Sequence, residues 1–154
     1  MSILRSQLLA TTITAIAMFG CASPRPLNLG LQNGRLRPCP QTPNCVSSEA
    51  GSAVEKLVFP FPAPGGRYDL ARLAAIVAAW PRTAVISRGG DYLHAESKSL
   101  IWRFTDDVEF RFDSAASVIH VRSASRVGKS DLGVNRKRVE GMRAAWATAI
   151  VGLR

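Results

Sequence analysis

Hydrophobic residues recur at helical spacing in two stretches of the chain. The first runs from a capping residue, Asp69, to Pro81, and the second begins at a capping residue, Asn135. The apolar positions are Leu70, Leu73, Val77 and Trp80 in the first stretch, and Val139, Met142, Trp146, Ile150 and Leu153 in the second. A period of three to four buries one side of each stretch, so two amphipathic helices are predicted.

Between the two helices the period changes to two, which is typical of strands. Strands are expected at residues 83–87, 92–97, 101–113 and 118–126. Asp106 interrupts the apolar side of the third strand, formed by Trp102, Phe104, Val108, Phe110 and Phe112, and it indicates a bend or turn at 105–107. Residues 54–61 also alternate, and they predict a first strand that Pro60 confines to an edge or an end.

The order of elements is strand, helix, several antiparallel strands, helix. We therefore expect an α+β fold: an antiparallel meander of four to six strands with one face covered by two helices.

The first 20 residues have the pattern of an export signal. A basic residue, Arg5, precedes an apolar run over residues 8–19, and Gly20 stands before Cys21. The run is shorter than the roughly 20 apolar residues of a membrane span and fits a secretory leader. We interpret residues 1–20 as a lipoprotein signal peptide and Cys21 as the lipidated residue. An ordinary cleaved signal and an uncleaved anchor are the alternatives, and all three place the domain outside the cytosol.

Residues 21–38 are rich in proline and lack apolar periodicity, so a tether is predicted there, followed by a single α+β domain over residues 39–154. Once Cys21 carries lipid, Cys39 and Cys45 remain as an even pair. Because disulfides persist outside the cytosol, we expect these two residues to be bridged. A metal or redox site, or two free thiols, are the alternatives.

The chain has a formal net charge of +9 at pH 7, which favours anionic partners. Five cations fall within residues 123–138, SASRVGKSDLGVNRKR, between the last predicted strand and the last helix. A helix N-terminus attracts anions, so this segment predicts an anion-binding site. The candidate residues are Ser123, Ser125, Arg126, Lys129, Asn135, Arg136 and Arg138. The alternative is a structural corner in which Asp131 pairs with arginines.

A second group of candidates is His94, Glu96 and His120, all on the polar side of predicted strands. Two imidazoles and a carboxylate suit a metal ion or a general base. The exposed side of a strand also carries polar residues at every second position without any function, so we assign no metal ligand and no catalytic residue.

Three segments carry a resemblance: CPQTPNCVSS at 39–48, DDVEFRFD at 106–113 and HVRSASRVGKSDLGVNRKRVE at 120–140. Together they resemble an uncharacterised family of small bacterial envelope proteins and some plastid proteins, known only as a domain of unknown function. The resemblance implies an envelope location and the domain boundaries, and it implies no catalytic residue.

We therefore expect a non-enzymatic envelope module, held at a membrane through lipid on Cys21 and facing the periplasm or the outer surface. It would bind anionic lipid, lipopolysaccharide or a cell-wall ligand, with no cofactor, and export argues against nucleic acid. One alternative is an envelope hydrolase that recruits Ser123 or Ser125, His120 and Asp131. The other is a structural module that docks a partner protein.

Overall fold

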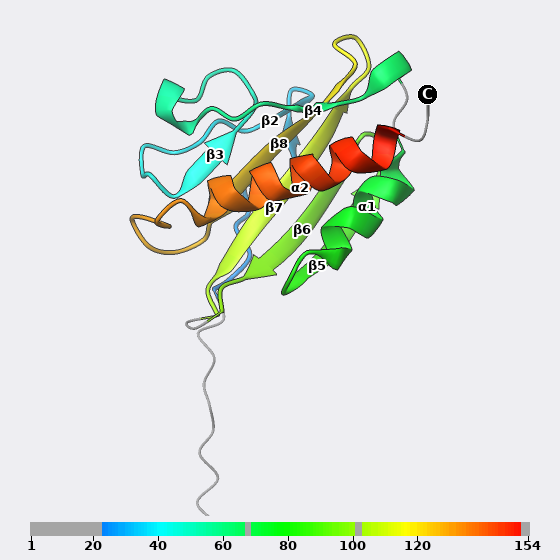
Figure 1. The fold of residues 1–154 in the computed structure, drawn as a ribbon. Coiled ribbons are helices and arrows are strands. Elements are labelled where there is room, and N and C mark those ends of the chain that lie inside the picture. The colour runs from blue at the N-terminus through cyan, green and yellow to red at the C-terminus, as the bar shows by residue number, and fades with distance from the viewer. Residues whose placement is uncertain (1–22, 67–68, 101–102, 152–154) are drawn as a thin grey trace, which may run out of the picture.

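The computed structural model describes residues 23–66, 69–100 and 103–151, which form one six-stranded antiparallel sheet, a small hairpin and two helices (Figure 1). The strands are β1 (Leu31–Gln32), β2 (Arg35–Leu36), β3 (Cys45–Ser47), β4 (Phe61–Pro62), β5 (Thr83–Gly89), β6 (Tyr92–Lys98), β7 (Thr105–Asp113) and β8 (Val118–Ser125). The helices are α1 (Leu70–Ala79) and α2 (Val134–Val151), and single 3-10 turns lie at Val54–Lys56 and Pro64–Gly66. The sheet order is β3-β8-β7-β6-β5, and β4 also pairs with β8.

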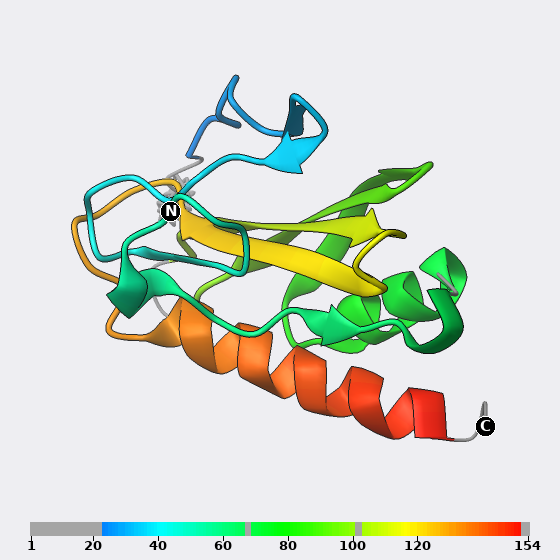
Figure 2. The same ribbon diagram turned by 90° about the horizontal axis from the view of Figure 1, so that it is seen from above.

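The two faces of the sheet are covered by different parts of the chain. Figure 2 shows α1 and α2 on one face, and the N-terminal segment with the β1–β2 hairpin on the other. The predicted α+β fold, with an antiparallel sheet and two helices on one face, is confirmed.

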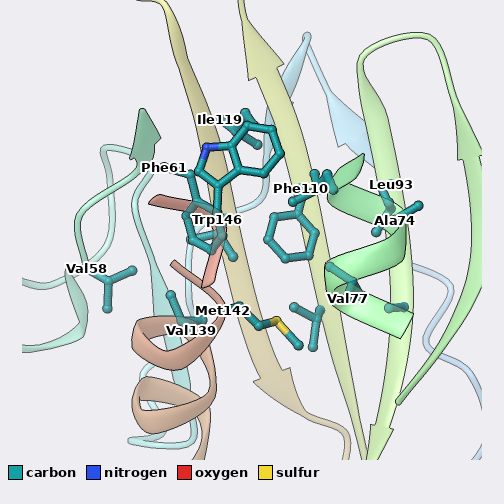
Figure 3. Packing of buried hydrophobic residues seen from close by; sticks show 14 of the residues in the cluster. Val58, Phe61, Ala74, Val77, Leu93, Phe110, Ile119, Val139, Met142 and Trp146 are labelled. Carbon is teal, nitrogen blue, oxygen red and sulfur yellow. The ribbon is translucent and has the colours of Figure 1, made fainter. Parts of the chain in front are cut away.

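The core lies between the sheet and the helices (Figure 3). Phe61 of β4 and Phe110 of β7 meet edge to face with ring centroids 5.5 Å apart. Trp146 of α2 is buried beside them, and its indole Nε1 donates to the Pro62 carbonyl at 2.6 Å. The apolar positions predicted for the two helices supply this core, since Leu73, Val77, Val139, Met142 and Trp146 are all buried. Leu153 lies outside the described residues.

The helix starts are held by acidic side chains. Asp69 caps α1 as predicted, because its Oδ1 accepts from the Arg72 backbone N–H at 2.8 Å. The prediction that Asn135 caps α2 is wrong. Asp131 does so, accepting from the backbone N–H groups of Gly133 at 3.1 Å and Asn135 at 2.8 Å. The N–H groups that a helix start offers to an anion are therefore partly taken by the protein's own carboxylate.

Two strand predictions need correction. Of the predicted strand 54–61, residues 54–60 form a 3-10 turn and a loop, and only Phe61 belongs to the short β4, because Pro60 and Pro62 cannot donate to a ladder. No turn interrupts β7 at 105–107: Asp106 continues the strand and is buried on the helix-covered face. The hairpin around Gly89–Gly90 is confirmed as β5 and β6. Trp102 lies outside the described residues.

The N-terminal part of the chain is anchored on the sheet. Cys39 and Cys45 form the predicted disulfide, with an S–S distance of 2.05 Å. Within the predicted tether, Leu36 is buried, and the Gly30 backbone N–H donates to Glu109 at 2.8 Å. The chain is thus packed against the sheet before residue 39 is reached. Cys21 and the predicted signal peptide lie outside the described residues.

Candidate functional site

The basic segment 123–138 lies at one end of the sheet, which we call the loop end. The loop end comprises residues 99–100 and 103–104 of the β6–β7 loop, the β8–α2 loop (126–133) and the first turn of α2. The ladder places them together, because Lys98 pairs with Thr105 and Asp106 pairs with Ser125. Successive side chains of a strand point to opposite faces, so the segment contributes to two separate polar networks.

The first network lies on the helix-covered face and centres on Asn135. Its amide nitrogen donates to the Asn44 carbonyl at 3.1 Å and to the Ser125 hydroxyl at 3.0 Å. Its amide oxygen accepts from the Ser123 hydroxyl at 2.5 Å and from Arg138 at 2.6 Å. Asn135 and Ser123 are fully buried, so these contacts replace water and join β3, β8 and α2.

Arg138 completes this network with an ion pair. Its guanidinium donates to Asp106 Oδ2 at 2.6 Å and to the Ser123 hydroxyl at 3.1 Å. Both charged side chains are nearly inaccessible to water. A buried arginine with three partners inside the chain is a brace of the fold, and it leaves little of the guanidinium for an external anion.

The second network lies on the opposite face and centres on Arg126. Its guanidinium donates to both carboxylate oxygens of Asp107, at 2.7 and 2.8 Å, and to Glu96 at 2.5 Å. His94 Nε2 lies 2.8 Å from the same aspartate. Burial acts to raise the pKa of Asp107, but the hydrogen bonds from Arg126 and His94 outweigh it and hold that pKa below its usual value. The hydrogen bonds to Asp107 and Glu96 in turn raise the pKa of Arg126, so the ion pair of Arg126 and Asp107 is charged at any physiological pH.

The N-terminal segment closes over this network. Arg126 donates to the Ser23 carbonyl at 3.0 Å, and Arg25 donates to Glu96 at 2.7 Å. Ser23, the first described residue, therefore lies at the loop end.

The three residues His94, Glu96 and Asp107 bring one ligand atom each to within 4.8 Å of one another, which is a spacing that suits a metal ion. The Arg126 guanidinium already donates to both carboxylates and supplies the positive charge. The predicted group of His94, Glu96 and His120 is not assembled, because His120 contacts Ser48 instead, with Nδ1 3.1 Å from the hydroxyl oxygen. Asp107 was missed because its pairing across the sheet is not visible in the sequence.

The predicted hydrolase arrangement is not formed either. Ser123 and Ser125 point to the helix-covered face, whereas His120, an odd number of residues away on β8, points to the other. Asp131 is occupied as the cap of α2. The serine that His120 meets, Ser48, accepts the Val121 backbone N–H at 2.8 Å and thereby ties β3 to β8.

The other two candidates lie nearer the surface. Arg136 donates to the carbonyls of Leu57 at 2.9 Å and Glu55 at 2.7 Å, so it holds the 3-10 turn against α2. Lys129 is exposed in the β8–α2 loop and makes no ion pair with a described residue. Among the four cations predicted to bind an anion, it is the one that is both exposed and without an ion pair to a described residue.

The loop end also carries apolar side chains that face water. Leu132 is 94% exposed and Leu100 is 71% exposed. Phe104, Val127 and Val134 are exposed to a smaller degree in the same two loops and the first turn of α2. Around them stand exposed cations: Arg82, Lys98, Arg103, Lys129 and Lys137. Sequence reasoning missed this surface, because single leucines in loops carry no periodic signal.

A protein family described as a protein of unknown function (DUF1499) matches residues 35–146. The chain belongs to this family. The DUF1499 match runs from β2 into α2 and contains both polar networks. It confirms the part of the resemblance that concerns a domain of unknown function, and it brings no activity with it. No curated protein and no solved structure matches the chain significantly. No helix among the described residues of this DUF1499 protein is long and apolar enough to cross a membrane.

Proposed function

We propose that the protein is a lipid-anchored envelope module that rests its loop end on an anionic membrane surface. The observation that carries the proposal is the exposure of Leu100 and Leu132 at the same end of the sheet as three exposed lysines that make no ion pair with a described residue. Apolar side chains inserted among headgroups, with cations beside them, are the features of proteins that lie on membranes.

The energetics favour such a contact. Moving one leucine side chain out of water contributes roughly 1.5–3 kcal/mol, and each cation near an anionic surface contributes about 1 kcal/mol. A single acyl chain alone gives only marginal membrane binding. Two leucines and three lysines, Lys98, Lys129 and Lys137, would therefore supply the additional binding free energy.

The position of the anchor supports the same orientation. Ser23 is held beside Arg126 at the loop end, and Cys21 is only two residues earlier in the sequence. Two residues span at most about 7 Å, so a lipid on Cys21 would lie near the loop end. The lipid and the loops would then meet one membrane from the same side.

This proposal changes which residues meet the anion. Arg126 and Arg138 are satisfied by Asp107 and Asp106, and they hold the loops in place. Lys129, with Lys98 and Lys137, has no such partner among the described residues and is free to contact lipid phosphates.

Co-sedimentation of unlipidated residues 23–154 with vesicles tests the proposal. Binding is expected to vesicles rich in phosphatidylglycerol and not to neutral ones. Leu100→Ser with Leu132→Ser is expected to abolish it, and Lys129→Ala with Lys137→Ala is expected to weaken it by more than tenfold, since about 2 kcal/mol is removed.

Matched control variants lie away from the loop end. Phe59 is 76% exposed before β4, which pairs with the start of β8, and Arg88 is exposed on the β5–β6 hairpin. Phe59→Ser and Arg88→Ala should leave vesicle binding unchanged. Equal losses in the control and loop-end variants, or no binding by the parent protein, would refute the proposed function.

A further inference from the structure

A cleft of about 360 Å³ opens at the loop end between the end of α1, the β6–β7 loop and the first turns of α2. We propose that this cleft binds one molecule of a single-chain lipid with a phosphate monoester headgroup. The inference rests on the proposed function and deepens it, because it assigns a specific headgroup site within the surface that meets the membrane. The volume is within the roughly 300–1,000 Å³ of small-molecule sites.

The walls of the cleft are suited to an alkyl chain. Trp80, Leu100 and Val134 line it, and the last two expose much of their apolar surface to water. Trp80 is fixed in position by α2, because a Cβ atom at Gly141 would lie 2.1 Å from its Cη2 atom. The indole thus lies directly on the helix where only glycine leaves room, and it forms a rigid apolar wall.

The rim of the cleft is suited to a phosphate. Arg82, Lys98 and Lys137 line it, and all three are exposed. Arg82 is oriented by a hydrogen bond from its Nε to the Lys98 carbonyl at 3.0 Å. Arg138 also lines the cleft, but it is paired with Asp106.

The lining residues include no aspartate or glutamate. Three cations without a carboxylate match a phosphate monoester, which carries up to two negative charges, better than a single carboxylate.

A second hollow, smaller than the cleft, also lies at the loop end. It measures about 140 Å³ and is lined by Arg136 and Lys56, but also by Glu55 and Asp131. Lys56 is engaged with the Pro40 carbonyl and Arg136 with two backbone carbonyls. Its smaller volume and its two carboxylates disfavour an anionic lipid, so the larger cleft is the site we assign.

Calorimetric titration of residues 23–154 tests the assignment. The probe is dodecyl phosphate below its critical micelle concentration, compared with inorganic phosphate and with uncharged dodecyl maltoside. Dodecyl phosphate is expected to bind at least about tenfold more tightly than either, since each comparator lacks one half of the recognised chemistry. Equal binding of inorganic phosphate would identify a simple phosphate site and overturn the proposal, as would equal binding of dodecyl maltoside or no binding at all.

Variants separate this site from the surrounding surface. Lys98→Ala with Lys137→Ala should weaken dodecyl phosphate binding by about 30-fold, the equivalent of two cations at an anion. Lys129→Ala, which removes an exposed cation outside the cleft, should leave that affinity unchanged while it weakens vesicle binding. If Lys129→Ala and the double variant weaken dodecyl phosphate alike, no defined cleft site exists. Loss of vesicle binding in the parent protein with dodecyl phosphate binding intact would instead refute only the surface proposal.

Discussion

Replacing Arg138 by methionine measures how much of the basic segment serves the fold. The side chain is 5% exposed and donates to Asp106, Ser123 and Asn135, which are themselves buried. Methionine fills a similar space but leaves the Asp106 carboxylate without its ion pair. Breaking a buried pair from one side costs roughly 3–5 kcal/mol. That is a large part of the 5–15 kcal/mol that stabilises a typical domain.

The measurement is urea unfolding of residues 23–154, followed by far-UV circular dichroism. Adding Asp106→Asn to Arg138→Met should recover part of the loss, because the uncompensated charge is removed, so the two substitutions should not be additive. Lys137→Met is the matched control, since Lys137 stands next to Arg138 on α2 but is exposed and makes no ion pair with a described residue. This substitution should change the free energy of unfolding by less than about 0.5 kcal/mol. A cost below about 1 kcal/mol for Arg138→Met would refute the assignment of Arg138 as a structural brace.

Two further predictions concern the other network and the cleft wall. Because the pKa of Asp107 is lowered in the folded state, its contribution to stability is complete above its ordinary value of 3.8 and is lost as the pH falls below it. The free energy of unfolding should therefore fall less steeply with decreasing pH in Asp107→Asn than in the parent protein. An equal slope in the two proteins between about pH 5 and 2 would contradict the pairing with Arg126. Gly141→Ala should lower the free energy of unfolding by about 1 kcal/mol, because displacing Trp80 costs more than the helix gains from alanine. A rise in thermal stability would show that the indole moves without cost.

The periodic part of the fold could be predicted from the sequence. The apolar ladder of α2 and the alternation along β7 and β8 each depend on neighbours a few residues apart, so local spacing predicts their buried faces. Residues 54–61 also alternate, but Phe59 is exposed, since Pro60 and Pro62, which follow it, prevent a continuous ladder.

The candidate site was harder to predict because its partners are far apart in the chain. The cluster of cations at 123–138 is visible in the sequence, but the acids that neutralise Arg126 and Arg138 lie 19 and 32 residues earlier. Asn135 was predicted to cap α2 because asparagine is a common residue at helix N-termini. In the structure, its amide has four partners, which are Asn44 just before β3, two serines of β8 and Arg138 of α2, and Asp131 caps the helix instead.

The adjacent pair Asp106 and Asp107 has a consequence for how the strands find one another. Their side chains point to opposite faces of β7, and each has its own arginine, Arg138 above the helix-covered face and Arg126 below the other. A slip of one residue in the pairing with β8 would turn every side chain of β7 to the opposite face, so only one of the two arginines would still meet an aspartate. The other arginine would face Thr105 or Val108 and stay buried without its carboxylate. The alignment seen in the structure therefore satisfies both arginines, and a one-residue slip in either direction satisfies only one.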